Sequence, residues 1–350
     1  MMVRLRKIIF SSLLALFVLF LFGSGQSVKA ASYDSNTLES YEIPDDVIQV
    51  MLDNSTCENG KSPTEDSQTP KSFTIGDLTK LKTVSLATRT KQADGSYQST
   101  PNSTIADWVA NGTAKSLYDV SDNVYALNTE GKVTGNSGSL ANYALVFDGH
   151  TLDNHYAPPF NMLMQIIASA NNATTVDLTG VTSEVKDTTL AQSLISLFQT
   201  PRLTSINTLL LGSDNLTDAG FYKMGDTVLN VKDTQNLTSL DLSNNGISQM
   251  AWSRNFPIAQ NLTDLNLSGN SVEKITDTLN RFLQPIVDKN GTADLSSSKL
   301  DVGDYNTIQY IVSLLNMAGG IIKLSDSSIN AVATSSAVTT SNTLKLNDQE

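Results

Sequence analysis

Two segments of the chain repeat one eleven-residue pattern at every defined position, and this repetition constrains the fold more than any other feature. The pattern is L-x-x-L-x-L-x-x-N-x-L, and its two complete copies begin at Leu237 and Leu262. A third copy begins at Ile206 and has Asp214 where the complete copies have Asn. Repetition at such a period indicates stacked units, because one unit cannot bury its apolar face alone.

Weaker copies extend the array in both directions. Counted by first position, the copies begin at residues 142, 173, 206, 237, 262, 290 and 319. Each interval is long enough for one strand, one helix and two turns. The segments between the strands carry the helical period, most clearly in Leu279, Phe282, Leu283, Ile286 and Val287. Pro285 lies in that stripe, and we expect it to kink the helix or end it early.

Strands that alternate with helices predict an α/β fold with a parallel sheet on one side and helices on the other. With this pattern the chain resembles the leucine-rich-repeat proteins, and in particular bacterial surface proteins of the internalin kind. Residues 43–47, followed by residues 73–81, are similar to the N-terminal cap of that group. The repeats are longer and less regular than in internalins. The resemblance implies a right-handed leucine-rich-repeat solenoid with a parallel concave sheet and helices on its convex side.

The first thirty residues have the organisation of a secretory signal peptide. A basic leader at 1–7 precedes an apolar run at 8–22, and small residues lie near Ala30. We expect cleavage after Ala30, with a membrane anchor as the alternative. No later segment has the roughly eighteen apolar residues that a spanning helix needs. The remaining chain is therefore expected outside the cell, secreted or wall-associated, without membrane contact after cleavage.

The same observations divide the chain into four parts. Residues 1–30 form the signal peptide, and residues 31–80 form an N-terminal polar segment and cap. The repeat array occupies 81–335, with 81–141 as an eroded portion. Residues 336–350 are an exit strand or a truncated repeat.

Charge and chemistry exclude several classes of function. The formal net charge is −12, which argues against nucleic acid as a partner. The single cysteine, Cys57, permits no intrachain disulfide, so stability has to come from a core. His150 and His155 do not have the spacing of a zinc signature, and no nucleotide-binding or serine-hydrolase motif is present. We expect a protein that is not an enzyme, and an extracellular hydrolase is the least favoured class.

The Asn of the repeat has a structural explanation. A chain that turns off a buried strand leaves backbone groups that need partners. We expect the ninth-position side chains Asp214, Asn245 and Asn270 to supply those partners. The leucines of the three clear copies are expected to be buried: Leu209, Leu211, Leu240, Leu242, Leu265 and Leu267.

Residues between the leucines should point to the opposite face of the sheet, because strand side chains alternate. The binding candidates on that face are Asp177, Asp241, Asp264, Asn266, Asp294, Ser243 and Ser268. Such a face suits a glycan, a basic peptide or a divalent cation between neighbouring carboxylates. The alternative is that these residues only keep the face soluble. We expect no cofactor and no metal site, with calcium as the weaker possibility.

These inferences favour a non-enzymatic binding protein, secreted or on the cell surface of a Gram-positive bacterium. It would act in adhesion to a host or matrix protein or glycan through its solenoid, as a monomer. The organism type follows from the resemblance and not from the composition. The alternative is a structural spacer of the envelope that has no specific ligand.

Overall fold

The structure is a computed structural model of the 350-residue chain. It describes residues 37–112, 114–115, 156–157, 167, 169–185, 205–227, 236–250, 260–296, 299–300, 307, 310 and 321–324. The predicted signal peptide, both histidines and the predicted exit strand lie outside the described residues. So do two further apolar stripes of helical period, Leu190, Leu194, Leu197 and Phe198, and Ile308, Ile311, Val312 and Leu315.

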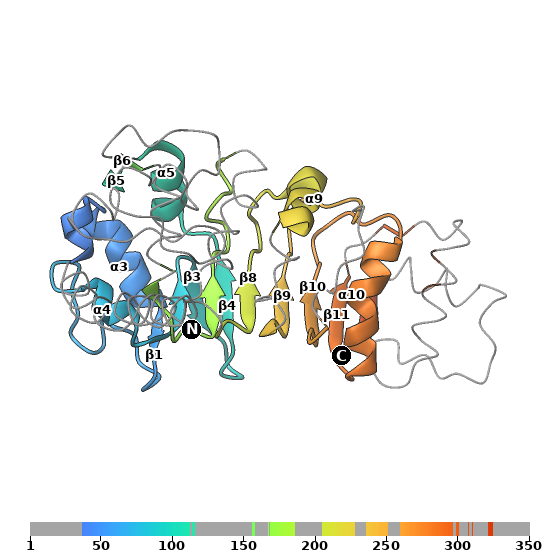
Figure 1. The fold of residues 1–350 in the computed structure, drawn as a ribbon, viewed down its shortest axis with the longest axis horizontal. Coiled ribbons are helices and arrows are strands. Elements are labelled where there is room, and N and C mark those ends of the chain that lie inside the picture. Colours follow the sequence, from blue (N-terminus) through green and yellow to red (C-terminus); the bar gives the residue numbers. More distant parts are fainter. Residues whose placement is uncertain are drawn as a thin grey trace, which may run out of the picture.

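The fold is mixed α/β and is built on a largely parallel sheet of eight strands. Their order is β1-β2-β7-β8-β9-β10-β11-β12, and only the pair β1 and β2 is antiparallel. Several of them stand side by side along the long axis of the molecule in Figure 1. Their bounds are Thr56–Cys57 (β1), Leu81–Ser85 (β2), Thr175–Asp177 (β7), Thr208–Leu210 (β8), Ser239–Asp241 (β9), Asp264–Asn266 (β10), Thr292–Leu295 (β11) and Ile321–Leu324 (β12).

The register of the sheet aligns equivalent positions of the repeats. Leu209 of β8 is paired with Leu240 of β9, which is paired with Leu265 of β10. All six leucines predicted to be buried are at most 2% exposed, and the strands that carry them are parallel. The predicted register is therefore confirmed for the three clear copies.

The sheet does not follow the predicted order of copies at its N-terminal end. Strand β2 pairs directly with β7, with Thr83 beside Thr175. No strand lies between them, and the copy expected to begin at residue 142 lies outside the described residues. After β2 the chain leaves the sheet and forms the hairpin of β3 (Thr88–Lys91) and β4 (Tyr97–Thr100), and then α5 (Ser103–Asn111). A further two-residue pair, β5 (Ala114–Lys115) with β6 (Tyr156–Ala157), also lies outside the main sheet.

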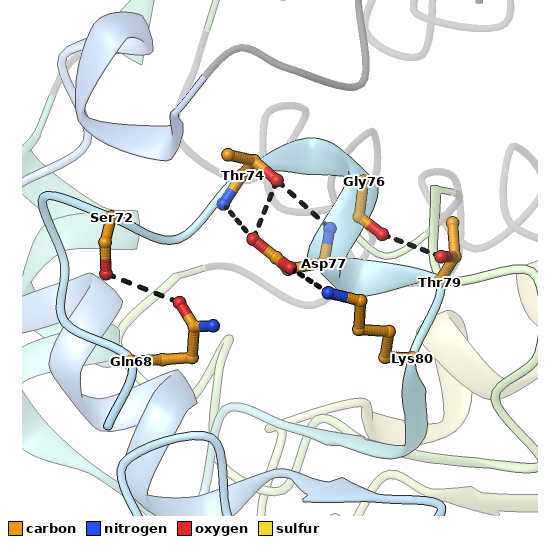
Figure 2. Close-up of polar contacts among 7 residues, drawn as sticks. All are labelled: Gln68, Ser72, Thr74, Gly76, Asp77, Thr79 and Lys80. Carbon is orange, nitrogen blue, oxygen red and sulfur yellow. Dashed lines mark hydrogen bonds and ion pairs between the residues drawn. The ribbon is translucent and has the colours of Figure 1, made fainter. Parts of the chain in front are cut away.

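The N-terminal segment covers the β1 end of the sheet. It contains η1 (Leu38–Tyr41), α3 (Asp45–Asn54) and α4 (Ile75–Leu78). Thr74 caps α4 by accepting a hydrogen bond from Asp77 N, while Asp77 Oδ2 accepts from Thr74 N in return (Figure 2). Burial disfavours the charge of Asp77, but hydrogen bonds from Lys80 and Thr74 outweigh it and lower the pKa. This reciprocal cap fixes the chain where it enters β2.

Two further helices follow β8 and β10 along the chain. Helix α9 spans Thr217–Thr227, and α10 spans Asp277–Asp288 beside β11 (Figure 1). All five residues of the predicted apolar stripe of α10 are buried. The helix continues past Pro285 to Asp288, so of the two expected effects of Pro285, a kink or an early end, the early end is wrong. Pro285 removes one helical hydrogen bond in the last turn, and the buried side chains that follow it hold that turn against the core.

Candidate functional site

The candidate site is the face of the parallel sheet opposite the leucine core, which we call the polar face. Two columns of side chains cross it in register. The first column contains Thr83, Thr175, Thr208, Ser239, Asp264, Thr292 and Ile321. The second contains Ser85, Asp177, Leu210, Asp241, Asn266, Asp294 and Lys323. The structure thus brings together the predicted residues of β9, β10 and β11.

The Asp and Asn side chains of the second column each accept a hydrogen bond from the backbone of the turn that follows their own strand. The side-chain oxygen of Asp241 accepts a hydrogen bond from Ser243 N at 2.7 Å, and Asn266 accepts one from Ser268 N at 3.0 Å. Asp177 bonds Thr179 N and Asp294 bonds Ser296 N in the same way. These are Asx turns, which close the chain as it leaves each strand. The sequence analysis missed this role, although Asp or Asn two residues before Ser or Thr is its recurring signal.

The second-column carboxylates also have neighbours across the strands. Asn266 Nδ2 donates to Asp241 Oδ2 at 3.0 Å, and Lys323 Nζ lies 3.6 Å from Asp294 Oδ2. An amide and an ammonium group therefore offset the repulsion expected between carboxylates of adjacent repeats. Within the described part of the chain, no group of three His, Cys, Asp or Glu side chains is placed to hold a metal ion.

Asp177 is not on an accessible surface, contrary to the expectation from strand alternation. Its exposed fraction is 0%, and its Oδ2 accepts hydrogen bonds from Ser85 Oγ at 3.1 Å and Ser99 Oγ at 2.5 Å. Ser99 belongs to the hairpin of β3 and β4, which folds over the polar face at β7. A segment inserted between two repeats thus covers one end of the column.

Accessibility divides the other binding candidates. Asp264 is exposed, while Asp241, Asn266, Asp294 and Ser268 are partly exposed. Ser243 is buried, which also differs from the expectation. Its Oγ lies 2.9 Å from where a side chain at Gly212 would begin, so the neighbouring turn packs closely against it. Ser239 and Thr292 are partly exposed first-column residues that the sequence analysis did not name as candidates.

The ninth-position residues connect each turn to the preceding one. Asn270 Oδ1 accepts from Asn245 N and Ile247 N, both at 3.0 Å, and its Nδ2 donates to Leu242 O at 2.8 Å. Asn245 accepts from the N–H groups of the preceding turn in the same way and donates to Leu211 O at 2.7 Å. Both amides are buried, so they supply partners to backbone groups that water does not reach.

Asp214 has the same place but lacks the amide donor. Its Oδ1 accepts from Thr182 N at 2.9 Å, while its buried Oδ2 has no hydrogen-bond partner among the described residues. Burial raises the pKa of Asp214 well above its ordinary value of 3.8, against the lowering effect of the bonds from Thr182. The nearby charges of Asp177 and Asp241 raise it further. A protonated carboxyl would supply the donor that Asn supplies in the next two turns.

Comparison with known proteins gives this chain no family assignment. No protein-family model matches it, and no curated protein matches it. Within the described ranges, no helix has the length and apolar character needed to cross a bilayer.

Proposed function

We propose that the chain is a secreted or cell-surface leucine-rich-repeat protein of a Gram-positive bacterium. Three observations support a solenoid: repeat leucines buried in register, parallel strands, and Asn side chains that bond each turn to the one before it. The signal-peptide pattern of residues 1–30 supports export. The proposed role is adhesion without catalysis, to a host or matrix protein or glycan.

The accessible polar face over β9, β10 and β11 carries this proposal. Neighbouring strands lie about 4.8 Å apart, so the two columns present hydroxyl, amide and carboxylate groups at regular intervals. An extended glycan or peptide has polar groups at comparable intervals along its length. Asp264 and Ser239 are the most useful contacts, because neither closes an Asx turn in its own repeat.

Binding through the carboxylates can be tested with an isosteric double variant. The chain without residues 1–30 is screened on glycan and matrix-protein arrays, and the affinity for any hit is measured against D241N/D294N. Asn keeps the Asx turns because its side-chain oxygen accepts the same N–H. The variant removes both charges, together with the acceptor that Asp241 Oδ2 offers to Asn266 Nδ2 and the ion pair of Asp294 with Lys323. We expect binding to a basic ligand to weaken about tenfold, and binding by the native chain to weaken with salt.

The matched control is E273Q/D288N, which neutralises two exposed carboxylates away from the polar face. It should bind as the native chain does. Unchanged affinity of D241N/D294N would exclude a direct role for these carboxylates. Absence of any array signal above background would favour the alternative function, a structural spacer of the envelope.

A further inference from the structure

A pocket lies beside the N-terminal end of the sheet, away from the accessible polar face. Its volume is about 430 Å³, within the range of small-molecule sites. The end of α3, the loop after β1 and the hairpin of β3 and β4 form its walls, and Asp53, Thr64, Glu65, Arg89 and Tyr97 line it. Hairpin and loop belong to different parts of the sequence, so only the folded chain forms this pocket.

Tyr97 gives the pocket an aromatic surface held in a fixed orientation. Tyr97 is 45% exposed, and it is one of few large apolar residues left exposed among the described residues. The Arg89 guanidinium lies over one ring face, 4.2 Å from the centroid. Arg89 Nη1 is itself anchored by Asn54 O at 3.2 Å and Thr56 Oγ1 at 3.1 Å. The contact with Arg89 holds the Tyr97 side chain beside the other lining residues of the pocket. A side chain that is already held in place loses less freedom when a ligand binds.

Polar groups around the ring are oriented but only partly used. Asp53 Oδ1 accepts from Thr64 Oγ1 at 2.6 Å, while its Oδ2 has no partner among the described residues. Glu65 Oε2 accepts from Ser62 N at 2.7 Å, and its Oε1 likewise has no partner in the described part of the chain. Arg89 Nη2 also has no hydrogen-bond partner among the described residues. Two carboxylate acceptors and one guanidinium donor thus remain for a ligand.

This combination matches the surface of a sugar ring. A pyranose has a face of C–H groups that packs on an aromatic ring, and hydroxyl groups around its edge that donate to carboxylates and accept from a guanidinium. Two carboxylates against one guanidinium leave the lining net negative, which disfavours phosphorylated or carboxylated ligands. We propose that the pocket binds a single pyranose residue that carries no negative charge. This site is separate from the polar face and does not depend on the function proposed for that face.

Ligand-observed NMR by saturation transfer tests the proposal directly. The probes are glucose, galactose, mannose, N-acetylglucosamine and glucosamine, with glucuronate as the anionic comparison, added to the chain without residues 1–30. We expect saturation transfer to at least one uncharged or amino sugar and weaker transfer to glucuronate. Absence of transfer to all five sugars, or stronger transfer to glucuronate, would overturn the proposal.

Variants then place the sugar in the pocket. Y97A and E65Q should each weaken binding about tenfold, because one removes the stacking surface and the other a charged acceptor. The matched control for Y97A is Y222A on α9, where the tyrosine is 41% exposed and far along the chain. Y222A and D264K should bind the sugar as the native chain does. Y97A can also disturb the hairpin. The E65Q result still tests the proposal, provided that E65Q and the native chain have equal unfolding midpoints. Binding that survives both Y97A and E65Q, or that is lost in D264K, would overturn the assignment.

Discussion

The residue before the ninth position of the repeat has a left-handed backbone conformation in four successive turns. Its φ is 74° at Gly180, 60° at Ser213, 54° at Asn244 and 73° at Gly269. A side chain at Gly269 would meet Asn244 Oδ1 at 1.9 Å, so the exposed Asn244 side chain would have to move to admit it. The turns therefore share one geometry, whichever residue occupies the ninth position. Asp214 occupies the same place in its turn as Asn245 and Asn270 do in theirs. Because an ionised Asp214 lacks their amide donor, it lowers the free energy of unfolding relative to Asn.

Replacing Asp214 with Asn should raise the free energy of unfolding by about 1–3 kcal/mol near neutral pH, because the amide supplies a buried donor. The carboxyl has a higher pKa in the folded chain than in the unfolded chain, so the unfolded chain releases its proton first as pH rises. The stability that Asp214 contributes is thus present below pH 3.8 and is lost as pH rises through the folded-state pKa. Urea unfolding at about pH 4 and about pH 7 measures the difference.

D264N is the control for this experiment, because it makes the same chemical change at an exposed carboxylate. Its effect should stay within about 0.5 kcal/mol at both values of pH. A gain in D214N that is equal at both pH values would contradict the titration, and a loss near neutral pH would contradict the missing donor.

At the scale of single elements, strand β8 carries two neighbouring leucines that differ in burial. Leu209 is fully buried, whereas Leu210 is only partly buried on the polar face. We expect L209A to lower the free energy of unfolding by about 2–5 kcal/mol, because it leaves a cavity in the core. L210A is the matched control and should cost less than about 1 kcal/mol. Chemical denaturation of both variants decides between them, and equal losses would show that the strand is out of register.

Insertions between strands decide what the strands present to solvent. The hairpin of β3 and β4 covers Asp177, places Tyr97 beside α3, and is followed by Pro101, which packs against the turn at Gly180. A side chain on Gly180 would meet Pro101 Cβ at 2.3 Å. The close approach fixes the chain as it leaves the hairpin. One insertion therefore both closes the polar face at β7 and forms the proposed sugar pocket.

At the scale of the whole molecule, the buried apolar side chains of the described residues form one cluster from Leu38 to Leu324. Each repeat contributes to it only through its neighbours, so the strands are expected to unfold together. The N-terminal segment belongs to the same cluster through residues such as Ile48 and Phe73. Cys57 is a free thiol, so this cluster stabilises the described chain without a disulfide from it.

Export should remove the first thirty residues. Cleavage after Ala30 is expected, because small residues follow the apolar run at a suitable distance. Intact-mass analysis of the exported protein measures the new N-terminus, which should be Ala31. Recovery of the full chain in a membrane fraction would instead show an anchor.

The sequence alone determined which side chains of the three clear copies form the core and how Asn245 and Asn270 bond their turns. Leu209, Leu240 and Leu265 occupy the same position of the repeat. When the units stack, residues at the same position of the repeat lie next to one another. The roles of Asn245 and Asn270 were predictable because a buried turn needs internal partners for its backbone.

Only the tertiary structure decided which residues of the sheet are accessible to solvent. Burial of Asp177 needs Ser85 and Ser99, which are far from it along the chain, and no local pattern records where the hairpin folds. The pocket beside α3 has the same origin, because its walls meet only after the inserted hairpin packs against the N-terminal segment.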